Sequence, residues 1–141
     1  MAHFSGKELY MEFNGQQISG DHRSLTVSRS ASTANTTAGA DTAESHIVLT
    51  TSATFDITIL DDTSAAGDDV RGVLFEGAEG TFTFGPQGNA AGKPKYSCGA
   101  SVTSVQISYP YDNVVEIQAT LTRNGDWIAN YDQNPTDVFG P

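Results

Sequence analysis

Apolar and polar side chains alternate along most of this 141-residue chain. The clearest run lies between His46 and Leu60, where mostly polar residues fill the even positions and six apolar residues fall on odd ones: Ile47, Leu49, Ala53, Phe55, Ile57 and Ile59. A period of two is typical of a strand with one buried face. At ~3.3 Å per residue an unbroken strand of this length spans roughly 50 Å, so we expect it to bend between two sheets or to reach beyond its own domain.

The same alternation predicts further strands, separated by turn signals. They cover residues 9–13, 23–31, 81–84, 95–109 and 114–122. Asn14-Gly15 and Asn124-Gly125 are the dipeptides most typical of tight hairpin turns. The apolar positions change from even to odd near Thr103-Ser104, which predicts a β-bulge there.

One segment follows a helical period instead. Ala66, Val70, Val73 and Leu74 are spaced as on one face of a helix, after N-cap candidates at 61–64 and before a glycine at position 77. We expect one short helix over about 65 to 76, with its apolar stripe packed against the β-structure.

Two segments lack the side chains that a core needs. Residues 32–45 contain no large apolar side chain, and they predict a long loop, which either becomes ordered on assembly or serves as a passive linker. Residues 130–141 have few apolar side chains and predict a C-terminal arm. The chain length favours one domain, over 1–141.

Charge and composition narrow the function classes. Seven Lys and Arg against 17 Asp and Glu give a net charge of -10, which opposes binding to nucleic acid through its phosphates. The single cysteine, Cys98, excludes an intramolecular disulfide and is expected to be a small strand hydrophobe. No run approaches the ~20 apolar residues of a membrane span, and the first residues lack the pattern of a secretion signal, so we expect folding in the cytoplasm and no contact with a membrane.

No constellation of reactive side chains is apparent. The three histidines do not have metal-ligand spacing, and the acidic cluster at 61–69 lacks the glycine and final glutamate of a calcium loop. The segment 88–94 lacks one spacer residue of a phosphate loop and has Pro94 where a hydroxyl is needed. We therefore predict no catalytic residue, no cofactor and no metal site. The aromatic side chains of the second half belong either to the core or to a sugar-stacking or protein-contact surface: Tyr96, Tyr109, Tyr111, Trp127 and Tyr131.

Four segments of the second half share a sequence pattern with a known family: 79–86, Lys93-Pro94-Lys95-Tyr96, 101–105 and 110–122. They resemble the tail tube (major tail) proteins of long-tailed phages and of gene transfer agents. The opening segment, 9–15, is similar to the first hairpin of that family. These are patterns of strand and turn, and they extend over about the whole chain.

The resemblance implies a mainly β fold, a two-sheet β-sandwich or barrel with one short flanking α-helix. It also implies six subunits in a ring, rings stacked head to tail, and long hairpins joined into an inner β-barrel. Such a tube belongs to the tail of a virion made in the host cytoplasm, and DNA passes through its lumen without specific binding. The implied partners are further copies of the chain, a tape measure protein, a tail terminator, and distal tail or baseplate proteins.

Candidate assembly residues lie in the long loop, the long strands and the C-terminal arm. They are Thr36, Thr37, Asp41, Glu44, Ile47, Leu49, Val105, Ile107, Tyr131 and Phe139. Three alternatives remain: an inner tube of a contractile or secretion particle, a carbohydrate-binding β-sandwich module, and a capsid decoration or head-tail adaptor protein. A binding module predicts a stable monomer, whereas an adaptor predicts a trimer or a single ring.

Overall fold

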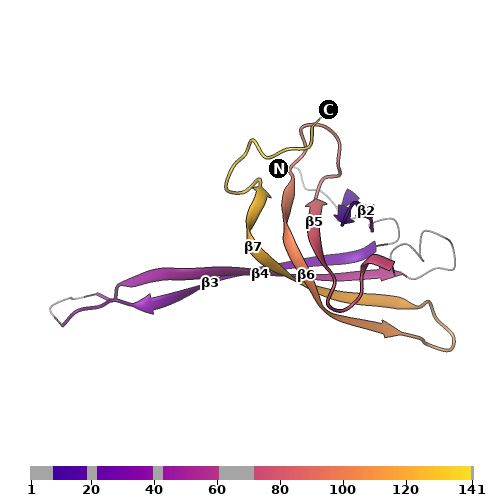
Figure 1. Cartoon of the computed structure of the whole chain (residues 1–141), viewed down its shortest axis with the longest axis horizontal. Helices are drawn as coiled ribbons and strands as arrows, with labels where there is room; N and C mark the ends of the chain where they lie inside the picture. Colours follow the sequence, from indigo (N-terminus) through magenta and orange to yellow (C-terminus); the bar gives the residue numbers. More distant parts are fainter. Residues whose placement is uncertain (1–7, 19–21, 40–42, 61–71, 141) are drawn as a thin grey trace.

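A computed structural model describes residues 8–18, 22–39, 43–60 and 72–140 (Figure 1). Seven strands dominate it, and two of them have 15 residues each. The strands are β1 (Tyr10–Phe13), β2 (Gln16–Gln17), β3 (His22–Asn35), β4 (His46–Leu60), β5 (Glu79–Gly85), β6 (Tyr96–Ser108) and β7 (Glu116–Asn130). The mainly β fold predicted from the alternation is confirmed.

All seven strands belong to one antiparallel sheet, in the order β2-β1-β5-β6-β7-β4-β3. The strand pairing does not divide the strands into the two sheets that were predicted. Two strands lie between β5 and β4 in the sheet, which in a flat sheet would separate them by roughly 14 Å. The ring centroids of Phe55 on β4 and Phe82 on β5 are nevertheless only 4.9 Å apart. The sheet therefore curls over, so that one face encloses the core.

The core fills the concave side of this curled sheet. Its largest fully buried side chains come from β1, β4, β5, β6 and β7 and from the residue after β2. They are Met11, Phe13, Ile18, Phe55, Ile57, Ile59, Phe82, Cys98, Val102 and Leu121. The odd positions of the second half of β4 are among them, as the alternation predicted.

The local signals for the first turn and the bulge are confirmed. Asn14 and Gly15 have φ of 55° and 82°, and they join β1 to β2 with Phe13 opposite Gln16. The pairing of β6 with β7 shifts between Val102 and Ser104, where the apolar phase changed in the sequence. The change of phase keeps apolar side chains on the core face on both sides of the bulge.

Asn124-Gly125 does not form the turn that its sequence predicted. The chain continues in β7, and Cys98 pairs with Trp127 while Ala100 pairs with Arg123, so three residues of β7 lie in a bulge. A Cβ on Gly99 would lie 2.9 Å from the carbonyl oxygen of Asn124, and the glycine therefore leaves the space that the bulge occupies.

Strands β3 and β4 extend beyond the rest of the sheet as a two-stranded projection, shown at the left of Figure 1. The predicted loop at 32–45 is shorter than expected, because residues 32–35 belong to β3 and pair with β4. Small hydroxyl and alanine side chains were interpreted as loop because they cannot anchor a core, but a projecting hairpin needs no core side chains. The long strand thus reaches beyond its own domain, as one of the two expectations had it.

The predicted helix is described only at its end. Gly72 and Val73 are helical, and residues 65–71 of the expected helix lie outside the described residues.

Residues 130–140 do not project as the predicted C-terminal arm. They fold back on the loop before β6, where the Phe139 N–H donates to the Lys93 carbonyl at 3.1 Å and the Lys95 N–H donates to the Asp137 carbonyl at 3.1 Å.

Candidate assembly site

The paired parts of β3, β4, β7 and β6 form a four-stranded ribbon, residues 22–28, 54–60, 116–122 and 101–108. One face of this ribbon lines the core, and the other, which we call the polar face, has small hydroxyl and amide side chains on all four strands. Leu60 and Glu116 lie on this face at one end of the ribbon, and its other members include Ser24, Thr26, Ser28, Thr54, Asp56, Thr58, Ser104, Gln106, Gln118, Thr120 and Thr122. None of these eleven side chains is buried in the described chain, so the face is largely uncovered.

The polar face has little net charge. Asp56 accepts a hydrogen bond from the Thr120 hydroxyl at 2.8 Å, and it is the one carboxylate among those eleven side chains. At one end of the ribbon, Arg23 and Glu116 form an ion pair at 2.6 Å that crosses β4. This pair neutralises the guanidinium, so the face presents no unpaired cationic group in the described part of the chain.

Both edges of the ribbon have backbone groups that could pair with another strand. On one edge, β3 has β4 as its neighbour on one side and no described strand on the other. On the opposite edge, β5 pairs only with Tyr96–Ser101 of β6, which leaves the outer side of residues 103–108 without a described neighbour. Exposed strand edges of this length are the usual sites of pairing between chains.

Beyond the ribbon, β3 and β4 pair only with each other, because β7 pairs with β4 from Thr54 onward. We call residues 29–35 and 46–53 the arm. The alternation of β4 is interrupted here: Ala31 pairs with Thr51 but Thr33 pairs with Val48, so β4 has one extra residue in a bulge. Ile47, Val48 and Leu49 lie at or beyond this bulge and are 52%, 64% and 56% exposed. Nearer the ribbon, hydroxyl side chains pair across the strands, such as Ser30 with Ser52 at 2.8 Å. A projecting hairpin with uncovered apolar side chains is typical of a protein-protein contact.

The predicted loop residues lie at the end of the arm. The Thr36 N–H donates to the Ser45 carbonyl at 2.7 Å, and the Ser45 N–H donates to the Thr37 hydroxyl at 2.8 Å. Glu44 lies 3.5 Å from the His46 imidazole. The fourth loop candidate, Asp41, lies outside the described residues.

Two arginines connect the base of the arm to the body of the protein. Arg123 on β7 donates to the Thr51 carbonyl at 2.9 Å and to its hydroxyl at 2.7 Å, and its guanidinium lies 5.3 Å from the centre of the Trp127 ring. Arg29 on β3 forms an ion pair with Asp132 at 2.9 Å. These contacts connect the base of the arm to β7 and to the segment that follows β7.

The remaining candidates do not lie on the arm. Val105 and Ile107 are half-buried on the core side of β6, next to its open edge. Phe139 is half-buried against the Tyr10 ring, with centroids 6.0 Å apart, and Tyr131 is also half-buried. The structure therefore places Ile47 and Leu49 on the arm with the described loop residues. The C-terminal candidates, Tyr131 and Phe139, are half-buried on the body of the same subunit.

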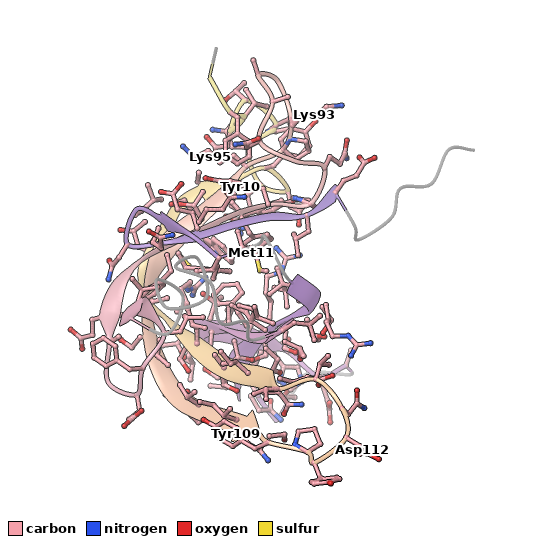
Figure 2. The ribbon with its side chains drawn as sticks, turned by 90° about the vertical axis from the view of Figure 1, so that its right-hand side faces the viewer. Tyr10, Met11, Lys93, Lys95, Tyr109 and Asp112 are labelled. Atoms are coloured by element: carbon pink, nitrogen blue, oxygen red, sulfur yellow. The ribbon has the colours of Figure 1, made fainter. Side chains whose placement is uncertain are left out.

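The sequence interpretation missed the exposed tip of the β6–β7 hairpin. Tyr109 and Tyr111 are 73% and 105% exposed, and Val114 is 50% exposed. Figure 2 shows Tyr109 and Asp112 at the lower end of the molecule, far from Lys93 and Lys95. The sequence Tyr109-Pro110-Tyr111 could have indicated this exposure. A proline disfavours continuation of a strand, so the two tyrosines beside it lie where the strand ends.

The described residues offer no reactive centre. No group of three or more His, Cys, Asp or Glu among them could hold a metal ion. None of the helical residues described belongs to a helix long and apolar enough to cross a bilayer. Cys98 is buried, and this burial raises the pKa of its thiol to about 11, which opposes formation of a nucleophilic thiolate.

Comparison with known proteins was made at the level of both sequence and structure. No protein-family model matches the chain, and no curated protein matches its sequence. Solved structures do match. The tail of an empty gene transfer agent particle, solved with C6 symmetry, superposes with a TM-score of 0.70 over 91% of this chain and 99% of the other. The chain has the tail tube fold.

Two further structures support this assignment of the fold. The virion of a native gene transfer agent particle contains a chain that superposes with a TM-score of 0.70 over 89% of this chain. The SPP1 tail tube superposes with a TM-score of 0.71 over 91% of this chain and 79% of the other. At identities of 15% and 12% this likeness is one of fold.

Proposed function

We propose that the protein is a structural, non-enzymatic subunit of a phage or gene transfer agent tail, and that it assembles with itself into a hollow tube that conducts DNA. The four-stranded ribbon carries this proposal, because it combines one uncovered polar face with two open edges. The tail tube fold and the C6 symmetry of the matched gene transfer agent tail support it. Tape measure, terminator and distal tail proteins are the further partners proposed for such a tail.

The strand directions of the ribbon allow closure into a barrel. In the order β6-β7-β4-β3 every neighbour is antiparallel, so β3 and β6 run in opposite directions. When identical copies stand side by side around an axis, β3 of one copy meets β6 of the next in the antiparallel sense. An even number of alternating strands per copy therefore gives a closed ring without a mismatched junction, which also removes both exposed edges.

The size of such a barrel suits its proposed cargo. Four strands from each of six copies, spaced ~4.8 Å apart and tilted by about 40°, give a barrel roughly 48 Å across between backbones. Side chains on the inner wall reduce the opening by about 10 Å, half the face-to-face spacing of sheets on each side. Duplex DNA passes through an opening of this width.

The polar face is the side of the ribbon that we place toward the lumen, since the other side is occupied by the core. Hydroxyl and amide groups bind water, and the face has no unpaired cation to hold a phosphate. Asp56 adds one carboxylate per copy. Duplex DNA would be repelled weakly and would slide past a hydrated wall.

Electron microscopy of the purified full chain at increasing concentration tests the assembly. We expect six-fold rings and hollow tubes, and sedimentation should show mass increasing with concentration. The proposal would be refuted if the protein stayed a monomer at all concentrations and salt conditions, and also after addition of tails isolated from its own particles.

Cysteine labelling tests the placement of the polar face. Ser104→Cys on that face and Ala91→Cys on the loop before β6 are both at exposed positions in the single subunit. In tubes, a small maleimide should label both, whereas a maleimide attached to a large protein should label only Ala91→Cys. Equal labelling of both by the large reagent would show that the polar face is on the outside.

The carbohydrate-binding alternative has less support. A sugar platform needs several aromatic rings exposed side by side. Tyr96, Trp127 and Tyr131 are half-buried, and the exposed Tyr109 and Tyr111 lie at a hairpin tip. The inner tube of a contractile or secretion particle has the same kind of architecture, and a sheath protein that wraps purified tubes would identify it.

A further inference from the structure

Exposed apolar side chains gather at the two opposite ends of the ribbon. Six of the eight large exposed hydrophobic residues in the described chain lie there: Ile47, Val48, Leu49, Tyr109, Tyr111 and Val114. Strands β4 and β6 run in the same direction, so the arm at the start of β4 and the tip at the end of β6 point away from each other. Figure 1 shows the arm at the left and the β6–β7 tip at the right. One subunit cannot bring these two groups together, but two subunits arranged head to tail can.

The angle between the arm and the body forms a recess that is suited to receive a projecting tip. A cavity of about 380 Å³ is lined by Leu49, Thr50, Thr51, Arg123, Gly125 and Asp126. A second of about 320 Å³ shares Thr51 and Arg123 and adds Arg29, Trp127 and Gln133. We call this recess the arm-base groove. It contains an aromatic ring and a guanidinium, which are enriched at the centre of protein interfaces.

We propose that the arm-base groove of one subunit binds the β6–β7 tip, Tyr109–Val114, of a second copy of this chain in the adjacent ring. The inference rests on the proposed tube and names the surface that the arm meets when rings stack. Tyr109 and Tyr111 supply large rings with few rotatable bonds, so their burial between Leu49 and Trp127 costs little conformational entropy.

Charge permits this pairing. The tip has one charged side chain, Asp112, and the groove has Arg123 beside Asp126. The hydrogen bonds of Arg123 to Thr51 come from a single terminal nitrogen, and a guanidinium has five N–H donors, so it retains donors for a carboxylate from another chain. Residues 36–39 and 43–45 at the end of the arm have Glu44 and no lysine or arginine, so we expect the tip at the base of the arm, away from its end.

The contact is heterologous, because the groove and the tip are different surfaces of the same chain. Contacts of this kind do not close on themselves when they run along an axis, and they extend into a filament. Side-by-side pairing of β3 with β6 builds a ring, and the groove with the tip joins one ring to the next. The two steps can be measured separately.

The first test measures the critical concentration for tube formation by full-length Tyr111→Ser. We expect an increase of about 30-fold or more, the usual effect of removing a central interface tyrosine, while single rings still form. Tyr111→Phe should assemble almost normally, and Ile128→Ser, which removes an apolar side chain 67% exposed elsewhere, should change the value by less than about threefold. Normal stacking of Tyr111→Ser overturns the inference but leaves the tube intact, whereas a wild-type chain that forms neither rings nor tubes overturns the proposed function itself.

A charge exchange tests the contact between the two named groups. Asp112→Lys and Arg123→Glu should each raise the critical concentration for stacking, and the double variant should lower it again by about fivefold or more relative to the product of the single effects. Thermal unfolding of each monomer separates loss of stacking from loss of folding. Strictly multiplicative effects in three folded variants would show that the two side chains do not meet, and would place the tip elsewhere.

Discussion

Phe55→Ala tests the curled sheet, the feature on which the positions of both the ribbon and the arm depend. The Phe55 side chain on β4 is fully buried. Its ring centre lies 4.9 Å from that of Phe82 and 5.8 Å from that of Phe84, both on β5, and 6.1 Å from the Trp127 ring. The contacts with Phe82 and Phe84 exist only because the sheet brings β5 over β4.

The expected cost can be estimated from the burial and the ring contacts. Removal of a buried phenyl ring costs about 3–5 kcal/mol, the sum of lost burial and the cavity that remains. A domain of this size has a total stability of about 5–15 kcal/mol, so the variant should lose a large fraction of it. At about 3 °C per kcal/mol the midpoint of thermal unfolding should fall by roughly 10 °C or more.

The assay is urea unfolding followed by tryptophan fluorescence, at a concentration where sedimentation shows a monomer. The matched control is Leu49→Ala, on the same strand but in the exposed part of the arm. Its stability should stay within about 0.5 kcal/mol of wild type, because little surface is buried there. A loss below about 1.5 kcal/mol for Phe55→Ala, or equal losses for the two variants, would mean that β5 does not cover β4.

Three further measurements probe other parts of the fold. Burial and a hydrogen bond to a carboxylate raise the pKa of Tyr96 from 10.0 to about 12. The stability that this phenol contributes is therefore complete below pH 10 and is lost as pH rises through 12. Tyr96→Phe should lose less stability over that range, measured as unfolding at each pH with phenolate absorbance as the signal. Gly85→Ala should cost about 1–3 kcal/mol in urea unfolding, since its Cβ would lie 2.5 Å from the Gly88 carbonyl oxygen, while Gly39→Ala, with open space around it, should cost less than about 0.5 kcal/mol. Cys98 should react with thiol reagents only on unfolding, and rapid labelling of the native monomer at neutral pH would contradict its burial.

The sequence predicted the strands well where one face is buried. The odd positions of β4, the Asn14-Gly15 turn and the bulge near Thr103 each follow from local rules of side-chain direction and backbone conformation. The mainly β fold and the tail tube likeness also followed from these patterns. The same rules predicted Ile47 and Leu49 as assembly residues, since their alternation continues past the point where a single domain can cover it.

Predictions from the sequence were less reliable for segments that do not pack against the core. Residues 32–35 look like loop because their side chains are small, yet cross-strand backbone pairing keeps them in β3. Asn124-Gly125 looks like a turn, yet the neighbouring strand β6 holds both sides of it in one strand. The C-terminal segment looks like an arm, yet its backbone bonds to the loop before β6. Each of these outcomes depends on a distant partner that a local pattern does not contain.

By itself, then, the sequence determined that the fold is mainly β and, where one face of a strand packs on the core, which face is apolar. The period of the side chains is a local property that the sequence contains in full. Only the tertiary structure decided the order of the strands, the curl that buries Phe55 against Phe82, and the contact of Arg123 with Thr51 at the base of the arm. The last of these contacts joins positions 72 residues apart, and its geometry follows from the packing of the whole sheet rather than from any one segment.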